Sequence, residues 1–321
     1  MDKIGIRRRW CVASAALLVI IMMRGVAASA SLDVSASHRT RYEHLENPFA
    51  GPARELDGAL FLRTLAAATV HFEPIQATVE LADSRVYLAD DDVPLSTSHV
   101  DAVEVLQALI GADVRDAFAA GAKADIRAGR MTIDVGSRRL VARNNFRNTI
   151  NAFTGIDARW QGAGGTGVRG LVAMPVERRP AARGDLADND IRIDREMTDV
   201  FLWGGFCESD IRSVHSELYL FGLHEDDSHR TPTRNRNLLT YGARAIREPQ
   251  KGRIGFEVEA TLQTGTSRAS TRSTDTIDLN HLAWFAHASL GYCADMAWSP
   301  RLRVAYDYAS GDRDPGDDDQ G

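Results

Sequence analysis

The strongest pattern in this sequence is a strict alternation of apolar and polar residues. Between positions 253 and 263 every even-numbered side chain is apolar, and every odd-numbered residue is polar or glycine. Positions 301–308 repeat the pattern, with Leu302, Val304, Tyr306 and Tyr308 on the apolar side. Because successive side chains of a β-strand point to opposite faces, each run predicts a strand with one apolar face and one polar face.

Weaker alternation predicts further strands over three runs, 168–176, 214–222 and 282–292. Polar stretches between the runs indicate long loops at 177–190, 225–237 and 265–278, and short turns lie at 73–74 and 297–300. Counting from Leu60 gives about twelve strands of roughly ten residues each. We therefore expect an all-β fold, a transmembrane antiparallel β-barrel. A soluble β-sandwich normally has shorter strands.

One segment does not follow this scheme. Behind Ser98 its apolar residues recur every three or four positions, at Val100, Val103, Leu106, Ile110, Val114 and Phe118. This spacing fits an amphipathic helix better than a strand, and such a helix would plug the barrel or lie in the periplasm. Because the same stretch also alternates in twos over a few residues, both interpretations stay open.

The first thirty residues have the three parts of a secretory signal peptide. Basic residues from Lys3 to Arg9 precede an apolar run, 12–23, that is too short to span a bilayer. The run leads to Ala28-Ser29-Ala30, the small-x-small pattern of a cleavage site. We therefore expect cleavage after Ala30 and three regions: the signal peptide 1–30, an N-terminal mature segment 31–56, and a barrel domain 57–321.

Charge and cysteine content exclude some classes of protein. After cleavage the chain has 33 basic and 43 acidic residues, a net charge of −10, which argues against a nucleic-acid partner. The remaining cysteines, Cys207 and Cys293, allow at most one disulfide. No later stretch has the length of a transmembrane helix, but a β-barrel needs only alternate residues to face lipid.

The last ten residues, 312–321, are rich in Asp and Gly and indicate a loop. A strand edge left open in hydrocarbon has unsatisfied backbone donors and acceptors. We therefore expect the barrel to be incomplete at its C-terminal end, with further strands outside this chain. On the same reasoning, the chain alone is not expected to form a stable closed barrel.

Two short blocks resemble a known family. Residues 129–141, GRMTIDVGSRRLV, with Arg143, Phe146 and Asn148, resemble the GR…GS-x-RL…R-x-x-F-x-N block of the alginate-export family. Residues 306–312, YDYASGD, resemble its Y-ASGD block. The resemblance runs from about Leu60 to Asp314, and it implies a porin-like β-barrel in the Gram-negative cell outer membrane. The family's namesake exports polyuronate through an arginine-rich pore, although members with this block need not transport alginate.

A polyuronate channel requires cations along a water-filled lumen, because each sugar carries a carboxylate. Alternation places Arg130 opposite Met131, so we expect Arg130 to face the lumen and Met131 to face lipid. The arginines that follow reach the constriction if their loop folds inward: Arg138, Arg139, Arg143 and Arg147. Alternatively, this loop is solvated, and its arginines pair with acidic neighbours or with lipopolysaccharide phosphates.

The polar faces of the later strands carry both signs of charge. The expected pore-lining residues there are Arg253, Glu257, Glu259, Arg301, Arg303 and Asp307. The lumen is therefore expected to be mixed in charge, which departs from a simple anion-selective pattern.

Other motifs lack the context that their chemistry needs. Residues 162–167 match G-x-G-x-x-G, but a β-like run follows where a dinucleotide site needs a helix, so we expect a hairpin tip. His281 and His287 do not have zinc-ligand spacing, and the acidic cluster near the C-terminus lacks the pattern of a calcium-binding hand. We expect no catalytic residues, no cofactor and no metal, and hence no enzyme.

Two functions from different classes remain. The first is an outer-membrane channel, a transport protein for an acidic saccharide or small anionic solute. The alternative is a non-transporting outer-membrane barrel that binds a partner or acts on lipid through its loops. The expected partners are outer-membrane lipid, lipopolysaccharide, the anionic solute and the barrel-assembly machinery.

Overall fold

The computed structural model describes residues 30–46, 55–89, 94–228, 231–311 and 319–320. Its elements, in chain order, are β1 (Ser31–Glu46), β2 (Glu55–Phe72), β3 (Ile75–Tyr87), β4 (Asp101–Arg115), β5 (Lys123–Met131), β6 (Phe153–Gln161), β7 (Gly167–Glu177), α2 (Arg183–Ala187), β8 (Arg195–Glu196), β9 (Val200–Ile211), β10 (Val214–Glu225), β11 (Asn237–Arg247), β12 (Ile254–Ser267), β13 (Leu279–Cys293), β14 (Arg301–Ala309) and β15 (Asp319–Gln320). Residues 1–29 of the expected signal peptide and most of 312–321 lie outside the described residues. Within the described ranges, no helix has the length and apolar character needed to cross a membrane.

One antiparallel sheet contains nearly all of these strands. The pairing follows chain order from β1 to β7 and from β9 to β14, and β7 pairs with β9. The short β8 pairs with the end of β7, and β15 pairs with β13. In the described residues this path contains twelve strands from β2 onward, the number that the sequence predicted. The all-β antiparallel fold is therefore confirmed.

The sheet begins earlier than the sequence indicated. Strand β1 lies in the segment 31–56, which the sequence analysis separated from the barrel. Its register with β2 runs from Ser31 opposite His71 to Glu46 opposite Glu55. The first strand therefore follows the expected cleavage site directly.

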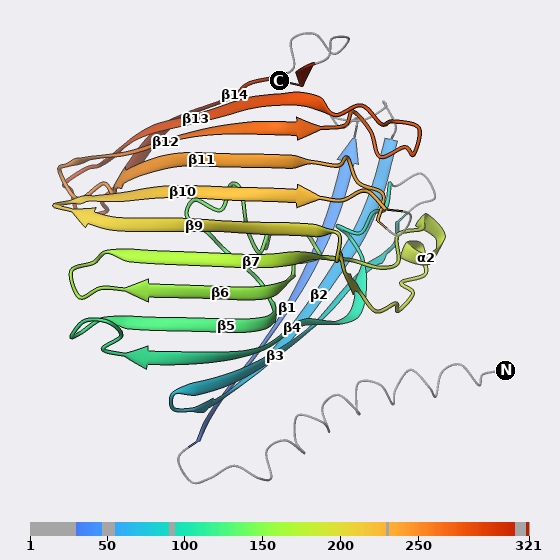
Figure 1. Ribbon diagram of the computed structural model, residues 1–321, viewed down its shortest axis with the longest axis horizontal. Helices are drawn as coiled ribbons and strands as arrows, with labels where there is room; N and C mark the ends of the chain where they lie inside the picture. Colours follow the sequence, from blue (N-terminus) through green and yellow to red (C-terminus); the bar gives the residue numbers. More distant parts are fainter. Residues whose placement is uncertain (1–29, 47–54, 90–93, 229–230, 312–318, 321) are drawn as a thin grey trace.

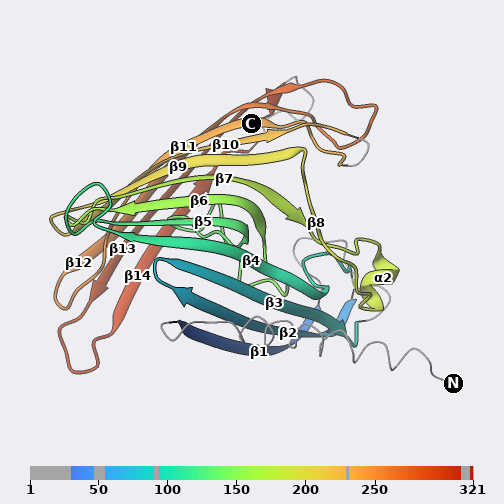
Figure 2. The same cartoon turned by 60° about the horizontal axis from the view of Figure 1, so that its bottom comes forward.

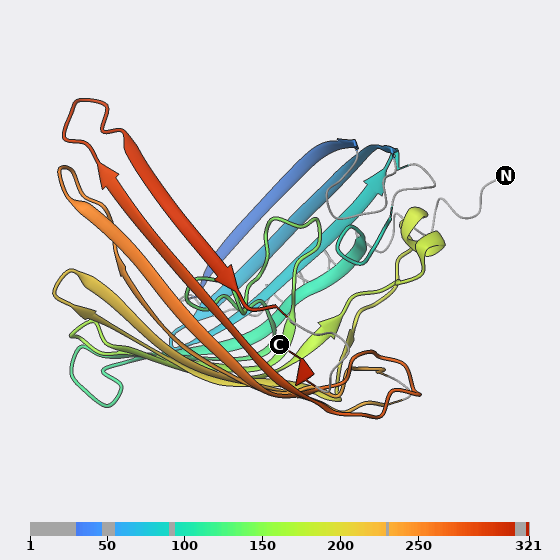
Figure 3. The same cartoon turned by 90° about the horizontal axis from the view of Figure 1, so that it is seen from above.

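The sheet curves into an open trough (Figure 3). Strands β1 to β4 form one wall of the trough, and β11 to β14 form the other. Within the described path, β1 and β14 are the two edge strands. Short connections such as 162–166 lie at one end of the strands, whereas α2 and other long connections lie at the opposite end (Figure 1). We name these the short-turn end and the long-loop end.

The two faces of the sheet follow the predicted alternation on most strands. On β12, Glu257 and Glu259 face the inside of the trough and are 7% and 4% exposed, whereas Val258 between them is 45% exposed. On the edge strand β14, Val304 is 67% exposed on the outward face. The outward rows thus provide the apolar surface that lipid requires.

Most of the segment from Val100 to Phe118, whose apolar spacing suggested a helix, is strand β4. Its register with β3 shifts twice, between Glu80 and Leu81 and between Ala82 and Ser84, and Val103 has a φ of 57°. Each shift is an irregularity of the β-bulge kind, which adds a residue and changes the two-residue alternation locally. The helical interpretation of this segment is therefore wrong.

The structure also places the glycine-rich motif and the two cysteines. Residues 162–166 connect β6 to β7, so the glycine-rich motif is a hairpin tip, as predicted. Cys207 and Cys293 are both free, so the disulfide that the sequence allowed does not form.

Candidate functional site

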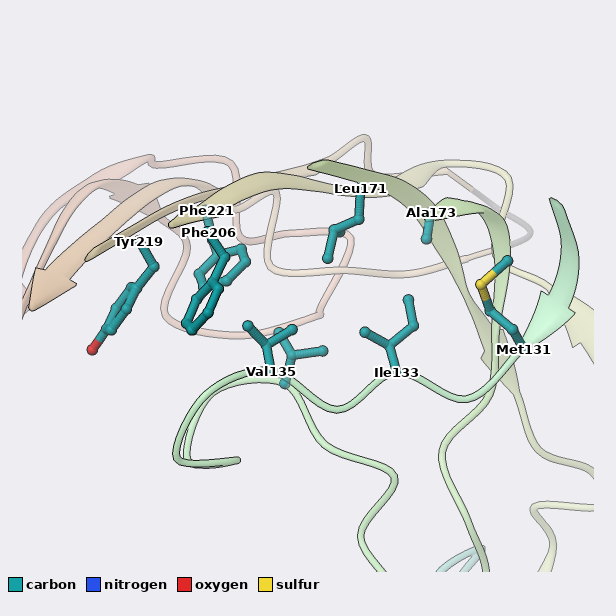
Figure 4. Packing of buried hydrophobic residues seen from close by; sticks show 9 residues of the cluster. Met131, Ile133, Val135, Leu171, Ala173, Phe206, Tyr219 and Phe221 are labelled. Atoms are coloured by element: carbon teal, nitrogen blue, oxygen red, sulfur yellow. The ribbon is translucent and has the colours of Figure 1, made fainter. Parts of the chain in front are cut away.

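The connection between β5 and β6 lies inside the trough. Among the buried side chains of this inner loop, residues 132–152, three belong to one apolar cluster: Ile133, Val135 and Val141. They pack against inward side chains of β7, β9 and β10, namely Leu171, Ala173, Phe206, Tyr219 and Phe221 (Figure 4). Because burial of one aliphatic side chain contributes roughly 1.5–3 kcal/mol, this apolar contact holds the loop against the sheet.

Strand β5 faces the opposite way from the prediction. Met131 is 2% exposed and belongs to the buried cluster inside the trough. The register places Arg130 on the outward face, in one row with Ala128 and Ile126. Because β5 ends at Met131, the apolar residues after it belong to the inner loop and not to a lipid-facing strand. The expectation of a lumenal Arg130 and a lipid-facing Met131 is therefore wrong.

Arginines of β1 and β2 hold the far side of the inner loop. Arg39 donates hydrogen bonds to the main-chain oxygens of Asn145 (2.9 Å) and Arg147 (2.7 Å). Arg63 on the neighbouring strand donates to the same two oxygens at 3.2 and 3.1 Å. Guanidinium groups thus satisfy loop carbonyls that would otherwise need water.

Asn148 is the most deeply buried polar anchor of the loop, at 0% exposure. Its side-chain amide donates to the main-chain oxygens of His99 (2.8 Å), Leu62 (3.1 Å) and Arg85 (3.2 Å). Its own main-chain oxygen accepts a hydrogen bond from the Ser84 hydroxyl at 2.8 Å. Asn148 therefore joins the loop to two strands of the wall and to the segment before β4.

Two of the predicted loop arginines form ion pairs with glutamates of the sheet. Arg143 binds both carboxylate oxygens of Glu80, one of them at 2.9 Å. Arg139 binds Glu259, and it lies 3.4 Å from Glu257. These contacts match the alternative interpretation, in which loop arginines pair with acidic neighbours. Their charge is therefore largely neutralised within the protein.

The remaining predicted residues of loops and turns are Arg138, Arg147 and Arg253. Arg138 is exposed, and it pairs with Asp134 at 3.2 Å. Arg147 donates to the side chains of Asn151 and Ser98. Arg253 is exposed in the turn between β11 and β12, and is not on the polar row of a strand.

The wall of β11 to β14, with the neighbouring β10, carries a network of paired charges. Glu257 accepts hydrogen bonds from Arg244 at 2.9 Å and from Arg303 at 2.6 Å, and Arg244 also binds Glu217 at 2.8 Å. Asp307 lies 2.7 Å from His287. By register, Arg301, Arg303 and Asp307 share the inward face of β14. This wall matches the mixed charge that the sequence predicted.

A set of functional residues not predicted from the sequence is the arginine wall, defined here as Arg39, Arg41 and Arg63. Within the described ranges, no carboxylate lies within 4 Å of Arg39 or Arg63, whereas Arg41 pairs with Glu43 at 2.9 Å. Arg41 also lies over the Phe146 ring of the inner loop, 5.4 Å from its centre. Arg39, Arg41 and Glu43 recur every second residue, and this alternation was the available signal of a strand.

A cavity of about 1590 Å³ lies beneath the inner loop, toward the short-turn end. Its lining mixes carboxylates with basic side chains, including Asp33, Asp113, Glu208, Arg127, Arg159 and Arg169. A polar space of this size can hold water and a hydrated solute. The inner loop therefore forms the boundary of a water-accessible cavity.

Two loop residues have shifted pKa values. Burial lowers the pKa of His99, whose Nδ1 accepts a hydrogen bond from the Ser96 main-chain N–H at 3.1 Å, so the neutral ring is favoured. Near α2, burial and the charges of Asp101 and Glu104 raise the pKa of Asp194 to about 8. The environment of Asp194 is therefore short of positive charge.

Comparison with solved structures finds a porin of similar fold. The crystal structure of Pseudomonas aeruginosa OccD3 (OpdP) matches with a TM-score of 0.50 and 11% sequence identity. The match covers 89% of this chain and 59% of OccD3, so this chain spans less than two thirds of that protein's length. At this identity the likeness concerns the fold alone.

Comparison with sequences gives the family. None of the curated proteins matches this chain. The family model described as alginate export matches residues 30–321, a range that contains every described strand and the inner loop. The chain therefore belongs to the alginate export family, and its fold is that of an outer-membrane β-barrel.

Proposed function

We propose that this protein is a passive outer-membrane channel for an acidic saccharide or a small anionic solute. The observation that carries the proposal is the arginine wall beside the inner loop. Two of its three guanidinium groups, those of Arg39 and Arg63, have no carboxylate partner in the described residues. Membership of the alginate export family and the porin-like fold support the channel function.

The two sides of the inner loop differ in their charge balance. On the β12 side, Glu257 and Glu259 are compensated by Arg139 and by arginines of neighbouring strands. On the β1 side, the arginine wall has excess positive charge. A carboxylate that loses water in a constriction needs such charge, and the planar guanidinium binds it with two parallel hydrogen bonds. We therefore expect an anionic solute to pass along the arginine wall.

Solute flux tests this proposal. Protein purified from outer membranes is reconstituted into liposomes, and the entry of a uronic-acid disaccharide is compared with entry of a neutral disaccharide of the same size. We expect faster entry of the acidic sugar. In the double variant Arg39→Gln/Arg63→Gln, this preference should fall at least threefold while entry of the neutral sugar persists.

The control replaces Arg272, an exposed arginine of the long loop between β12 and β13, with Gln, and it should keep the preference. Equal entry of both sugars into wild-type liposomes would contradict anion selection. If neither sugar entered, the non-transporting barrel would become the better account.

A further inference from the structure

A second cluster of charged side chains lies at the long-loop end, where the loop between α2 and β8 meets the beginning of β4. Figure 2 shows α2 and β8 together at this end of the sheet. Oxygen atoms of Asp101, Glu104 and Asp194 lie within 4.8 Å of one another, and all three residues are buried. Separate parts of the chain therefore bring three carboxylates to one point.

The charges of this cluster do not balance. Arg130 forms ion pairs with Glu104 at 2.7 Å and with Glu196 at 2.8 Å. The second guanidinium nearby, that of Arg178, donates instead to a main-chain oxygen and to the side chain of Asn151. Among the described residues, four carboxyl groups thus face two guanidinium groups, so the fully ionised cluster has two negative charges in excess. Burial of uncompensated charge is costly, so the cluster either holds protons, as the raised pKa of Asp194 indicates, or binds a further positive charge.

The unused oxygens show where that charge would bind. Asp101 is 3% exposed, its carboxylate accepts no hydrogen bond in the described structure, and its Oδ1 is fully buried without a partner. Glu104 Oε2 accepts a hydrogen bond from the Asp194 main-chain N–H at 2.9 Å, and Asp194 Oδ1 accepts one from the Arg179 N–H at 2.7 Å. Asp101 therefore offers an oxygen without a hydrogen-bond partner, and one of its carboxylate oxygens lies within 4.8 Å of carboxylate oxygens of Glu104 and Asp194.

We propose that Asp101, Glu104 and Asp194 form a Ca²⁺ site. The donors are all oxygens, which suits a hard divalent cation, and Ca²⁺ accepts carboxylates in one-oxygen or two-oxygen mode at 2.3–2.6 Å. Ca²⁺ accepts irregular and flexible oxygen geometry, whereas Mg²⁺ demands a near-ideal octahedron and usually keeps several of its waters, so three carboxylates from separate parts of the chain suit Ca²⁺ better. A single Ca²⁺ also supplies the two positive charges that the cluster lacks.

The site would connect two parts of the fold. Asp101 and Glu104 belong to β4, whereas Asp194 lies in the loop that follows α2. A cation bound by all three holds this loop against the sheet. Its removal takes away the bonds that join Asp194 to Asp101 and Glu104, so the loop should be held less tightly against β4.

Calcium binding to the whole protein tests the proposal. Protein purified from outer membranes in detergent is stripped with EGTA, and ⁴⁵Ca²⁺ binding is measured by equilibrium dialysis. We expect Asp101→Asn to bind one Ca²⁺ per chain fewer than wild type, and Asp194→Asn to show the same loss. The control Asp188→Asn, at an exposed aspartate of the same loop, should bind as wild type does. Circular dichroism identifies variants that fail to fold.

Loop accessibility provides the second readout. Ca²⁺ should slow tryptic cleavage after Arg192 at least tenfold in wild type and in Asp188→Asn, but not in Asp101→Asn. A tenfold excess of Mg²⁺ should not reproduce this protection. The proposal is overturned if Asp101→Asn and Asp194→Asn retain wild-type binding, and the choice of Ca²⁺ is overturned if Mg²⁺ protects equally well.

Discussion

Replacement of Ile133 with Ala should release the inner loop from the sheet without unfolding the strands. Ile133 is completely buried and packs against side chains of the sheet inside the trough. The change removes three carbon atoms, and each buried carbon contributes about 0.8 kcal/mol, so the attached loop should lose about 2–3 kcal/mol. Since 1.4 kcal/mol changes an equilibrium tenfold, the detached fraction should rise about 30- to 150-fold.

Native-state proteolysis measures this fraction. When opening and closing are fast relative to cleavage, the cleavage rate follows the population of the open form. The rate of tryptic cleavage at Arg138 and Arg139 in folded protein should therefore rise by the same factor. Leu140→Ala is the matched control, because Leu140 belongs to the same loop but is 47% exposed.

The two variants should differ clearly. Leu140→Ala should change the cleavage rate less than fivefold, and both proteins should keep the β-sheet circular dichroism of wild type. If Ile133→Ala were cleaved no faster than Leu140→Ala, apolar packing would not be what holds the loop.

Three further predictions concern other parts of the molecule. Asn148→Ala leaves three main-chain oxygens without their donor, so it should destabilise the attached loop by about 1–3 kcal/mol, with faster tryptic cleavage at Arg147. Unchanged cleavage would refute its role as an anchor. Val304→Arg places a charge on the outward face and should cost about 2–4 kcal/mol near the bilayer midplane in refolding titrations, whereas Arg303→Ala should cost less. Burial lowers the pKa of His99 below 6.5, so its stabilising effect is present above pH 6.5 and is lost as pH falls through the lower folded value. The melting temperature of wild type should therefore fall more than that of His99→Gln between pH 7 and pH 4.5, and equal falls would contradict this.

The alternation in β12 and β14 predicted both faces correctly, because each strand has one clearly apolar row. The same reasoning failed at β5. Its outward row contains the small residues Ala124 and Ala128 with Ile126, whereas the more apolar sequence from Met131 onward contacts the sheet from inside the trough. Lipid and a packed loop both exclude water, so hydrophobicity alone does not distinguish them.

The candidate site was only partly predictable for a related reason. The mixed charge of the β12 wall follows from Glu257, Glu259 and their neighbours, which alternate along single strands. The arginine wall instead depends on register, which places Arg39 opposite Arg63 across two strands far apart in sequence. A single sequence shows the alternation within a strand, but pairing between strands depends on tertiary structure.

The reversal potential across a planar bilayer tests the central claim most directly. With purified wild-type protein in a tenfold KCl gradient, excess positive charge at the arginine wall predicts a reversal potential of the sign that Cl⁻ selectivity gives. In Arg39→Gln/Arg63→Gln the potential should move toward zero or reverse, while Arg272→Gln should leave it unchanged. A cation-selective wild-type channel, or a potential that the double variant does not alter, would contradict the account.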